Sequence, residues 1–64
     1  MDQADLDSQM RRVKRHLDDA ADYARRAKND AYSQDVDAAS ENIRRAADEI
    51  DSALTIVNRI RREL

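Results

Sequence analysis

Apolar residues recur along this chain in two heptad stripes, and this spacing constrains the fold more than any other feature. Each stripe advances by alternating steps of three and four residues, so its members share one side of an α-helix. The stripes consist of Leu6, Met10, Val13, Leu17, Ala20, Ala24, Ala27 and Ala31, and of Val36, Ala39, Ile43, Ala46, Ile50, Ala53, Val57, Ile60 and Leu64. A period of 3.5 residues is typical of a helix packed along its length on another helix. The sequence therefore predicts two long helices.

The chain should turn between the stripes. From Ala31 to Val36 the step is five residues, which would rotate the stripe of a continuous helix by about 140°. Asn29 tolerates the left-handed conformation that ends a helix, and Ser33 suits the N-cap of the next helix, with Asp35 in its first turn. We therefore expect residues 1–64 to form a single all-α domain, an antiparallel two-helix hairpin of the alanine-rich coiled-coil type. Helix one should cover about residues 3–29, the turn about 30–34 and helix two about 35–63.

The composition agrees with a helical protein. Charged residues make up 41% of the chain, yet the net charge is only −2, and the chain contains no glycine, proline or cysteine. Regularly placed apolar residues with a balanced charge argue against disorder. No apolar run approaches the ~20 residues of a membrane span, and the acidic opening residues lack the apolar core of a signal peptide. We expect a cytoplasmic protein that does not enter a membrane.

The large apolar residues gather toward the two ends of the chain, which an antiparallel hairpin brings together. Each helix can cover only one side of its partner, so a lone hairpin leaves apolar surface in water. We expect two hairpins to form a homodimeric four-helix bundle, or one hairpin to be completed by helices of another protein. The residues predicted to carry self-association are Leu6, Met10, Val13, Leu17, Ile50, Leu54, Ile56, Val57 and Ile60. Leu54 and Ile56 are expected at the edge that faces the partner.

Residues suited to catalysis are scarce. His16 is the only histidine, and we expect it to pair with Glu49 rather than to act as a general base. A di-metal site in a helix bundle needs Glu-x-x-His pairs, which the three glutamates do not provide. The sequence therefore predicts neither an enzyme nor a cofactor or metal site.

Basic residues on helix one raise a second function. Arg11, Arg12, Arg15, Arg25 and Arg26 could follow a nucleic-acid backbone. Asp18, Asp19 and Asp22 interrupt the same helix, and alternating charge blocks of this kind are typical of a solvated, salt-bridged helix surface. Binding of RNA or DNA is thus the alternative, not the first, interpretation.

In length, alanine-rich heptads and an aspartate at the bend, in Asp30-Ala31, the chain resembles the plasmid repressor-of-primer family. Proteins of that family are helical hairpins that dimerise into four-helix bundles and bind paired RNA loops. The resemblance is one of architecture, and it implies a dimeric bundle. The function predicted from the sequence is that of a non-enzymatic interaction protein, a homodimeric scaffold or adaptor acting through protein–protein contacts. The alternative is a small regulatory RNA- or DNA-binding protein.

Overall fold

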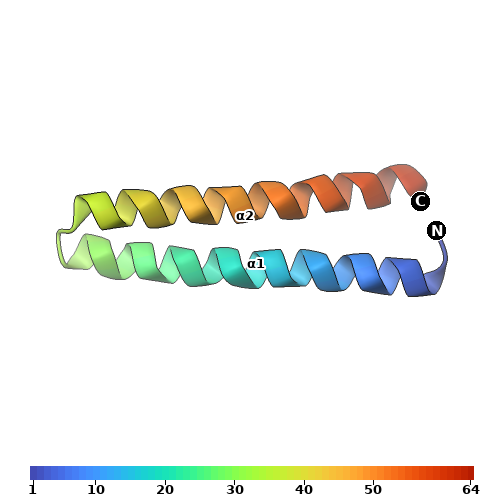
Figure 1. Cartoon of the computed structure of the whole chain (residues 1–64), viewed down its shortest axis with the longest axis horizontal. Helices are drawn as coiled ribbons and strands as arrows, with labels where there is room; N and C mark the ends of the chain where they lie inside the picture. The colour runs from blue at the N-terminus through green and yellow to red at the C-terminus, as the bar shows by residue number, and fades with distance from the viewer.

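Two antiparallel helices lie side by side in the computed structural model, which describes residues 1–64 (Figure 1). Helix α1 spans Gln3–Tyr32 and helix α2 spans Val36–Glu63, so the predicted helical hairpin is confirmed. The molecule is a rod of 48 × 16 × 10 Å. Its turn lies at one end, and both termini meet at the other end (Figure 1). Neither helix contains a segment apolar enough to cross a membrane.

The turn is shorter and later than the sequence suggested. Helix α1 continues through Asn29 and ends at Tyr32, so that only residues 33–35 connect the helices. Gln34, and not Asn29, adopts the left-handed conformation, with φ 62°. The Asp35 N–H donates to the Asp30 carbonyl at 2.8 Å, and the Gln34 N–H donates to the Ala31 carbonyl at 3.0 Å. This pair of hydrogen bonds is the Schellman motif, built here without glycine.

The caps also differ from the prediction at the turn. Asp35 is the N-cap of α2, and its Oδ1 accepts a hydrogen bond from the Ala38 N–H at 3.1 Å. Ser33, the predicted N-cap, instead ends α1 and donates its own N–H to the Asn29 carbonyl. An N-cap side chain must reach the third residue of its helix. Because α2 begins at Val36, Asp35 can do this and Ser33 cannot.

Alanine dominates the buried seam between the helices. The buried residues are Val13, Ala20 and Ala27 of α1 and Ala39, Ala46, Ala53, Ile56 and Ile60 of α2. Alanine lets two helix backbones approach more closely than leucine or isoleucine would. The larger members, Val13, Ile56 and Ile60, form one cluster with Ala53, against which Leu6 and Val57 pack. The seam is therefore narrow near the turn and bulkier near the free ends, as the sequence predicted.

The conformation of Gln34 leads to a stability prediction. A side chain with a Cβ atom costs about 1 kcal/mol or more in the left-handed region, whereas glycine avoids that cost. Gln34→Gly should therefore raise the free energy of unfolding by roughly 0.5–1 kcal/mol, measured by chemical denaturation at a fixed chain concentration. Ser40→Gly, at an exposed position inside α2, is the control and should lower it by about 0.5 kcal/mol. A loss of stability in Gln34→Gly would contradict the assigned turn.

Candidate self-association face

On each helix the buried residues form a row along the seam. The helix surface on one side of that row differs in polarity from the surface on the other side. A residue four places after a buried residue lies about 40° to one side of the row, and one three places after lies about 60° to the other. The three-residue step gives His16, Tyr23 and Asp30 on α1 and Asn42, Glu49, Arg59 and Glu63 on α2, together with the buried Ile56. We call this side the polar flank.

Cross-helix contacts seal the polar flank. The Asn42 Nδ2 donates to the Asp30 Oδ2 at 2.7 Å, and the His16 Nδ1 lies 2.7 Å from the Glu49 Oε2. Each of these four side chains follows a buried residue by three places, so both helices turn this side in the same direction. The His16–Glu49 pair was expected from the sequence. It sets the register of the two helices, and Leu17 and Ile50 each follow one of the two paired residues by one place.

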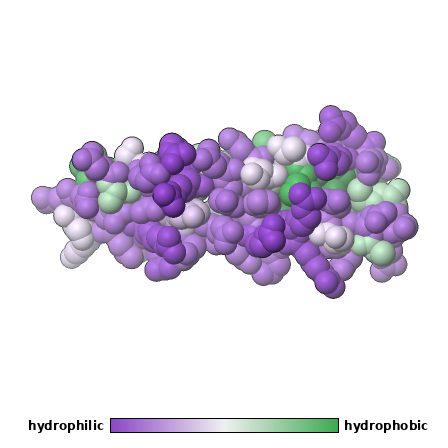
Figure 2. Space-filling model, viewed as in Figure 1, coloured by the Kyte–Doolittle hydropathy of each residue, from purple (hydrophilic) through white to green (hydrophobic).

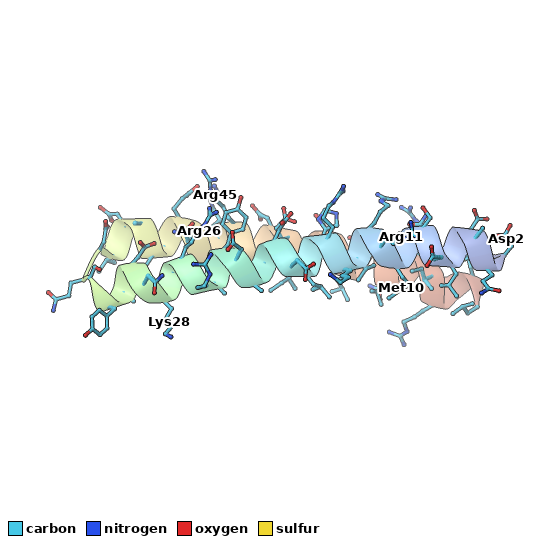
Figure 3. The ribbon with its side chains drawn as sticks, turned by 90° about the horizontal axis from the view of Figure 1, so that it is seen from below. Asp2, Met10, Arg11, Arg26, Lys28 and Arg45 are labelled. Atoms are coloured by element: carbon cyan, nitrogen blue, oxygen red, sulfur yellow. The ribbon has the colours of Figure 1, made fainter.

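The four-residue step leads to the opposite side, which is apolar. We call it the open face, and its large exposed residues are Met10 and Leu17 of α1 and Val36, Ile43, Ile50 and Leu54 of α2. Leu17 is 47% exposed, Ile50 is 50% exposed and Ile43 is 60% exposed. Met10 and Lys28 point to one side of the hairpin, and Arg26 and Arg45 point to the other (Figure 3). Large aliphatic side chains are thus left half in water on a single face of the rod.

The face that carries the polar flank looks quite different. It is mainly hydrophilic, and its largest apolar patch lies in the half of the rod near the free ends (Figure 2). Tyr23 lies there between two guanidinium groups, with its ring centre 5.3 Å from Arg26 and 5.9 Å from Arg45. These cation–π contacts extend the polar surface over both helices.

The nine residues predicted for self-association divide between the seam and the open face. Val13, Ile56 and Ile60 are buried inside the hairpin, and Leu6 and Val57 pack against them. Met10, Leu17, Ile50 and Leu54 remain exposed on the open face. The prediction that Ile56 lies at a partner-facing edge is wrong, because Ile56 is only 4% exposed.

Two open-face residues were absent from the predicted set. Val36 and Ile43 are 74% and 60% exposed, and both belong to the second heptad stripe. That membership was the feature of the sequence from which their place on the open face could have been predicted. Concentrating on the bulky free ends of the hairpin led the prediction away from them.

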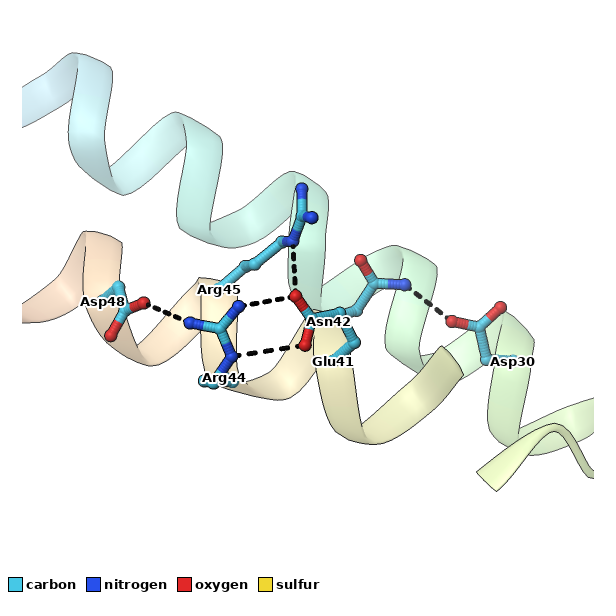
Figure 4. Close-up of polar contacts among 6 residues, drawn as sticks. All are labelled: Asp30, Glu41, Asn42, Arg44, Arg45 and Asp48. Carbon is cyan, nitrogen blue, oxygen red and sulfur yellow. Dashed lines mark hydrogen bonds and ion pairs between the residues drawn. The ribbon is translucent and has the colours of Figure 1, made fainter. Parts of the chain in front are cut away.

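Ion pairs within each helix occupy much of the outer surface. Arg44 bridges Glu41 and Asp48, and Arg45 also bonds to Glu41 at 3.1 Å (Figure 4). The guanidinium groups of Arg44 and Arg45 lower the pKa of the Glu41 carboxyl to about 2. These pairs lie in water and contribute little stability each.

The ion pairs of the outer surface join residues three or four places apart on a single helix. Asp22 pairs with Arg25 and Arg26, and its pKa is lowered mainly by the hydrogen bond from Arg25. The Asp7 carboxylate likewise pairs with Arg11 of the same helix at 3.0 Å, and not with a residue across the seam. A partner one turn away on the same helix is closer than one across the seam.

The five arginines predicted for nucleic-acid contact do not act as one free cluster. Arg11, Arg25 and Arg26 are held in ion pairs with aspartates of α1. Arg12 donates to the side chain of Gln9 at 3.2 Å, and Arg15 forms no ion pair. A nucleic-acid phosphate would have to compete with carboxylates for three of the five.

Two shallow hollows lie in the half of the rod near the free ends. One is bordered by Asn58, Arg61 and Arg62. The other is bordered by Arg12, His16, Ser52, Thr55, Ile56 and Arg59.

No three side chains of the types His, Cys, Asp and Glu are grouped so that they could hold a metal ion. No protein-family model, curated protein or solved structure matches this chain.

The low pKa of Glu41 predicts a pH dependence. Because the pKa is lower in the folded chain than its ordinary value of 4.5, this carboxylate stabilises the fold above pH 4.5. That contribution is lost as the pH falls from 4.5 toward 2. Glu41→Gln should therefore lower the midpoint of thermal unfolding at pH 7 but bring it close to the unsubstituted chain at pH 2, as measured by circular dichroism. Glu63→Gln, which removes a carboxylate without an ion pair, should show a smaller difference at pH 7.

Proposed function

We propose that this hairpin pairs with a second copy of itself through the open face, and that the resulting four-helix bundle serves as a non-enzymatic scaffold or adaptor. The observation that carries the proposal is the one-sided distribution of apolar surface. Leu17, Ile43, Ile50 and Leu54 are each about half exposed on one face, whereas the opposite flank is sealed by polar contacts. A face of this kind is typical of helices that pack in a bundle.

Surface area supports the same proposal. The hairpin exposes 4947 Å², whereas a compact globular chain of the same mass exposes about 4,200 Å². Two hairpins joined as compactly as one globular protein would bury about 2,900 Å² between them. That area falls in the range of roughly 2,000–5,000 Å² that is typical of obligate homodimers.

A second copy matches the open face better than an unrelated surface does. The face runs along the rod as two columns of aliphatic residues, one from each helix, with the large residues Leu17 and Ile50 at its middle. An identical rod presents the same two columns at the same spacing, so both faces can be covered at once. Another helical protein with a similar apolar stripe is the alternative occupant.

Loss of self-association on adding a charge to the open face is the test. Ile50→Asp puts a carboxylate at the centre of the proposed contact, where it would be buried without a partner. Multi-angle light scattering across a dilution series should give twice the 7.4 kDa chain mass for the unsubstituted protein. It should give the mass of one chain for Ile50→Asp at the same concentrations.

Ser52→Asp is the matched control. It adds the same charge two residues away, at an exposed position outside the open face, and should keep the mass of two chains. An Ile50→Asp variant that still forms dimers would show that the open face is not the contact. A single-chain mass for the unsubstituted protein at every concentration would point to another helical protein as the occupant.

Nucleic-acid binding is the second candidate, and one observation favours it. Arg12 and Arg59 come from different helices and border the same hollow, and neither is held in an ion pair. Against it stand the ion pairs of Arg11, Arg25 and Arg26. We therefore expect no mobility shift of RNA or DNA at low salt. A shift that weakens with salt and is lost in Arg12→Gln, but not in the ion-paired control Arg44→Gln, would favour this candidate instead.

A further inference from the structure

We infer that the two copies lie in opposite directions, with the turn of each hairpin against the free ends of the other. The two-fold axis then crosses the rod level with Leu17 and Ile50. This inference rests on the proposed function, because it describes how the two open faces meet. It names the arrangement of the partner, which self-association by itself leaves open.

Symmetry permits two ways of placing the open faces together. With the two-fold axis along the rod, turn lies beside turn, and α1 packs on α2 of the partner. With the axis across the rod, turn lies beside free ends, and each helix packs antiparallel on its own counterpart. Both are isologous contacts that cover the open face completely. Side-chain size and charge distinguish between them.

The size of the open-face residues varies along the rod. In the register fixed by His16 and Glu49, Met10 lies level with Val57 near the free ends, and Ala24 lies level with Ile43 near the turn. With turn beside turn, Ala24 and Ile43 of one copy would meet the same two residues of the other copy at one end. Met10 and Val57 would meet their own counterparts at the other end. Reversal places Ala24 against the partner's Met10. At each height along the rod, small and large side chains then lie together. The core of a bundle is filled evenly when side-chain volumes alternate in this way.

The outer rim of the open face shows the same complementarity. Along α2, reversal places Leu54 beside the partner's Ala47, a large residue against a small one. Along α1, it places Asp7 beside the partner's Lys28, which forms no ion pair within its own chain. Turn beside turn would instead pair Leu54 with the partner's Lys14. It would also place Ala21 against the partner's Ala47, where two small side chains leave a gap.

The two halves of the rod differ in net charge. The half with the free ends, residues 1–17 and 51–64, has seven basic and five acidic side chains, a net charge of +2. The half with the turn, residues 18–50, has five basic and nine acidic side chains, a net charge of −4. Reversal brings the positive half of one copy against the negative half of the other. Turn beside turn would place like charges together, which costs energy at these separations.

Distance measurement between spin labels tests the arrangement. The chain has no cysteine, so a single introduced cysteine gives one label per chain. Tyr32→Cys labels the end of α1 beside the turn, where the native side chain is 91% exposed. Opposite directions predict a label separation of about 40–45 Å across the dimer, from the rise of the helix. Turn beside turn predicts a separation of about 10–25 Å, set by helix packing distances.

Asp19→Cys is the control, since this exposed residue lies almost level with the proposed axis. Its label should give a separation below about 35 Å in either arrangement. A short distance from both labels would overturn the reversed arrangement while leaving self-association intact. The absence of any intermolecular distance from the Asp19→Cys label would overturn the proposed self-association as well.

Discussion

The close approach of two helices along a row of alanines is the interaction on which the rest of this structure depends. Ala20 and Ala27 on α1 and Ala39, Ala46 and Ala53 on α2 are buried in the seam. Small side chains bring the helix backbones together, so the seam has room for only one row from each helix. The larger residues of the same heptad stripes, such as Leu17, Ile43 and Ile50, are displaced from the seam to one side. The open face is therefore a direct consequence of the alanine seam.

The two sides of the seam have unlike physical roles. On the polar flank, His16 with Glu49 and Asp30 with Asn42 join the helices by polar contacts. The His16–Glu49 contact fixes the register near the middle of the rod, and the Asp30–Asn42 contact joins the helices near the turn. The open face carries no such groups, and its aliphatic residues can be removed from water only by another surface. The hairpin is thus joined by polar contacts on one side and leaves aliphatic side chains in water on the other.

Charge acts at two scales in this molecule. Locally, ion pairs such as Arg44 with Glu41 and Asp48 link residues one turn apart on the same helix. They are exposed, so each adds little to stability. Over the whole rod, the half with the free ends is positive and the half with the turn is negative. This long-range separation does not hold the hairpin together, but in the proposed dimer it would favour opposite directions of the two rods.

The sequence by itself determined the two helices, their antiparallel pairing and the contact of His16 with Glu49. The uninterrupted heptad stripes and the five-residue step between Ala31 and Val36 contain that information. In a helix, the spacing of residues along the sequence determines which of them share one side. The end of α1 was less predictable. Gln34 adopts a conformation that its residue type does not favour, and it does so because the hydrogen bonds from Gln34 and Asp35 back to α1 close the turn.

Only the tertiary structure decided which members of the stripes face inward. A 3.5-residue repeat contains two alternating sets of positions, and spacing does not say which set centres the seam. The structure places Val13, Ala20 and Ala27 there and leaves Met10 and Leu17 outside. That choice depends on how closely two particular surfaces can approach, which is a property of both helices together. For the same reason, Ile56 looked like surplus apolar surface in the sequence and proved to be part of the core.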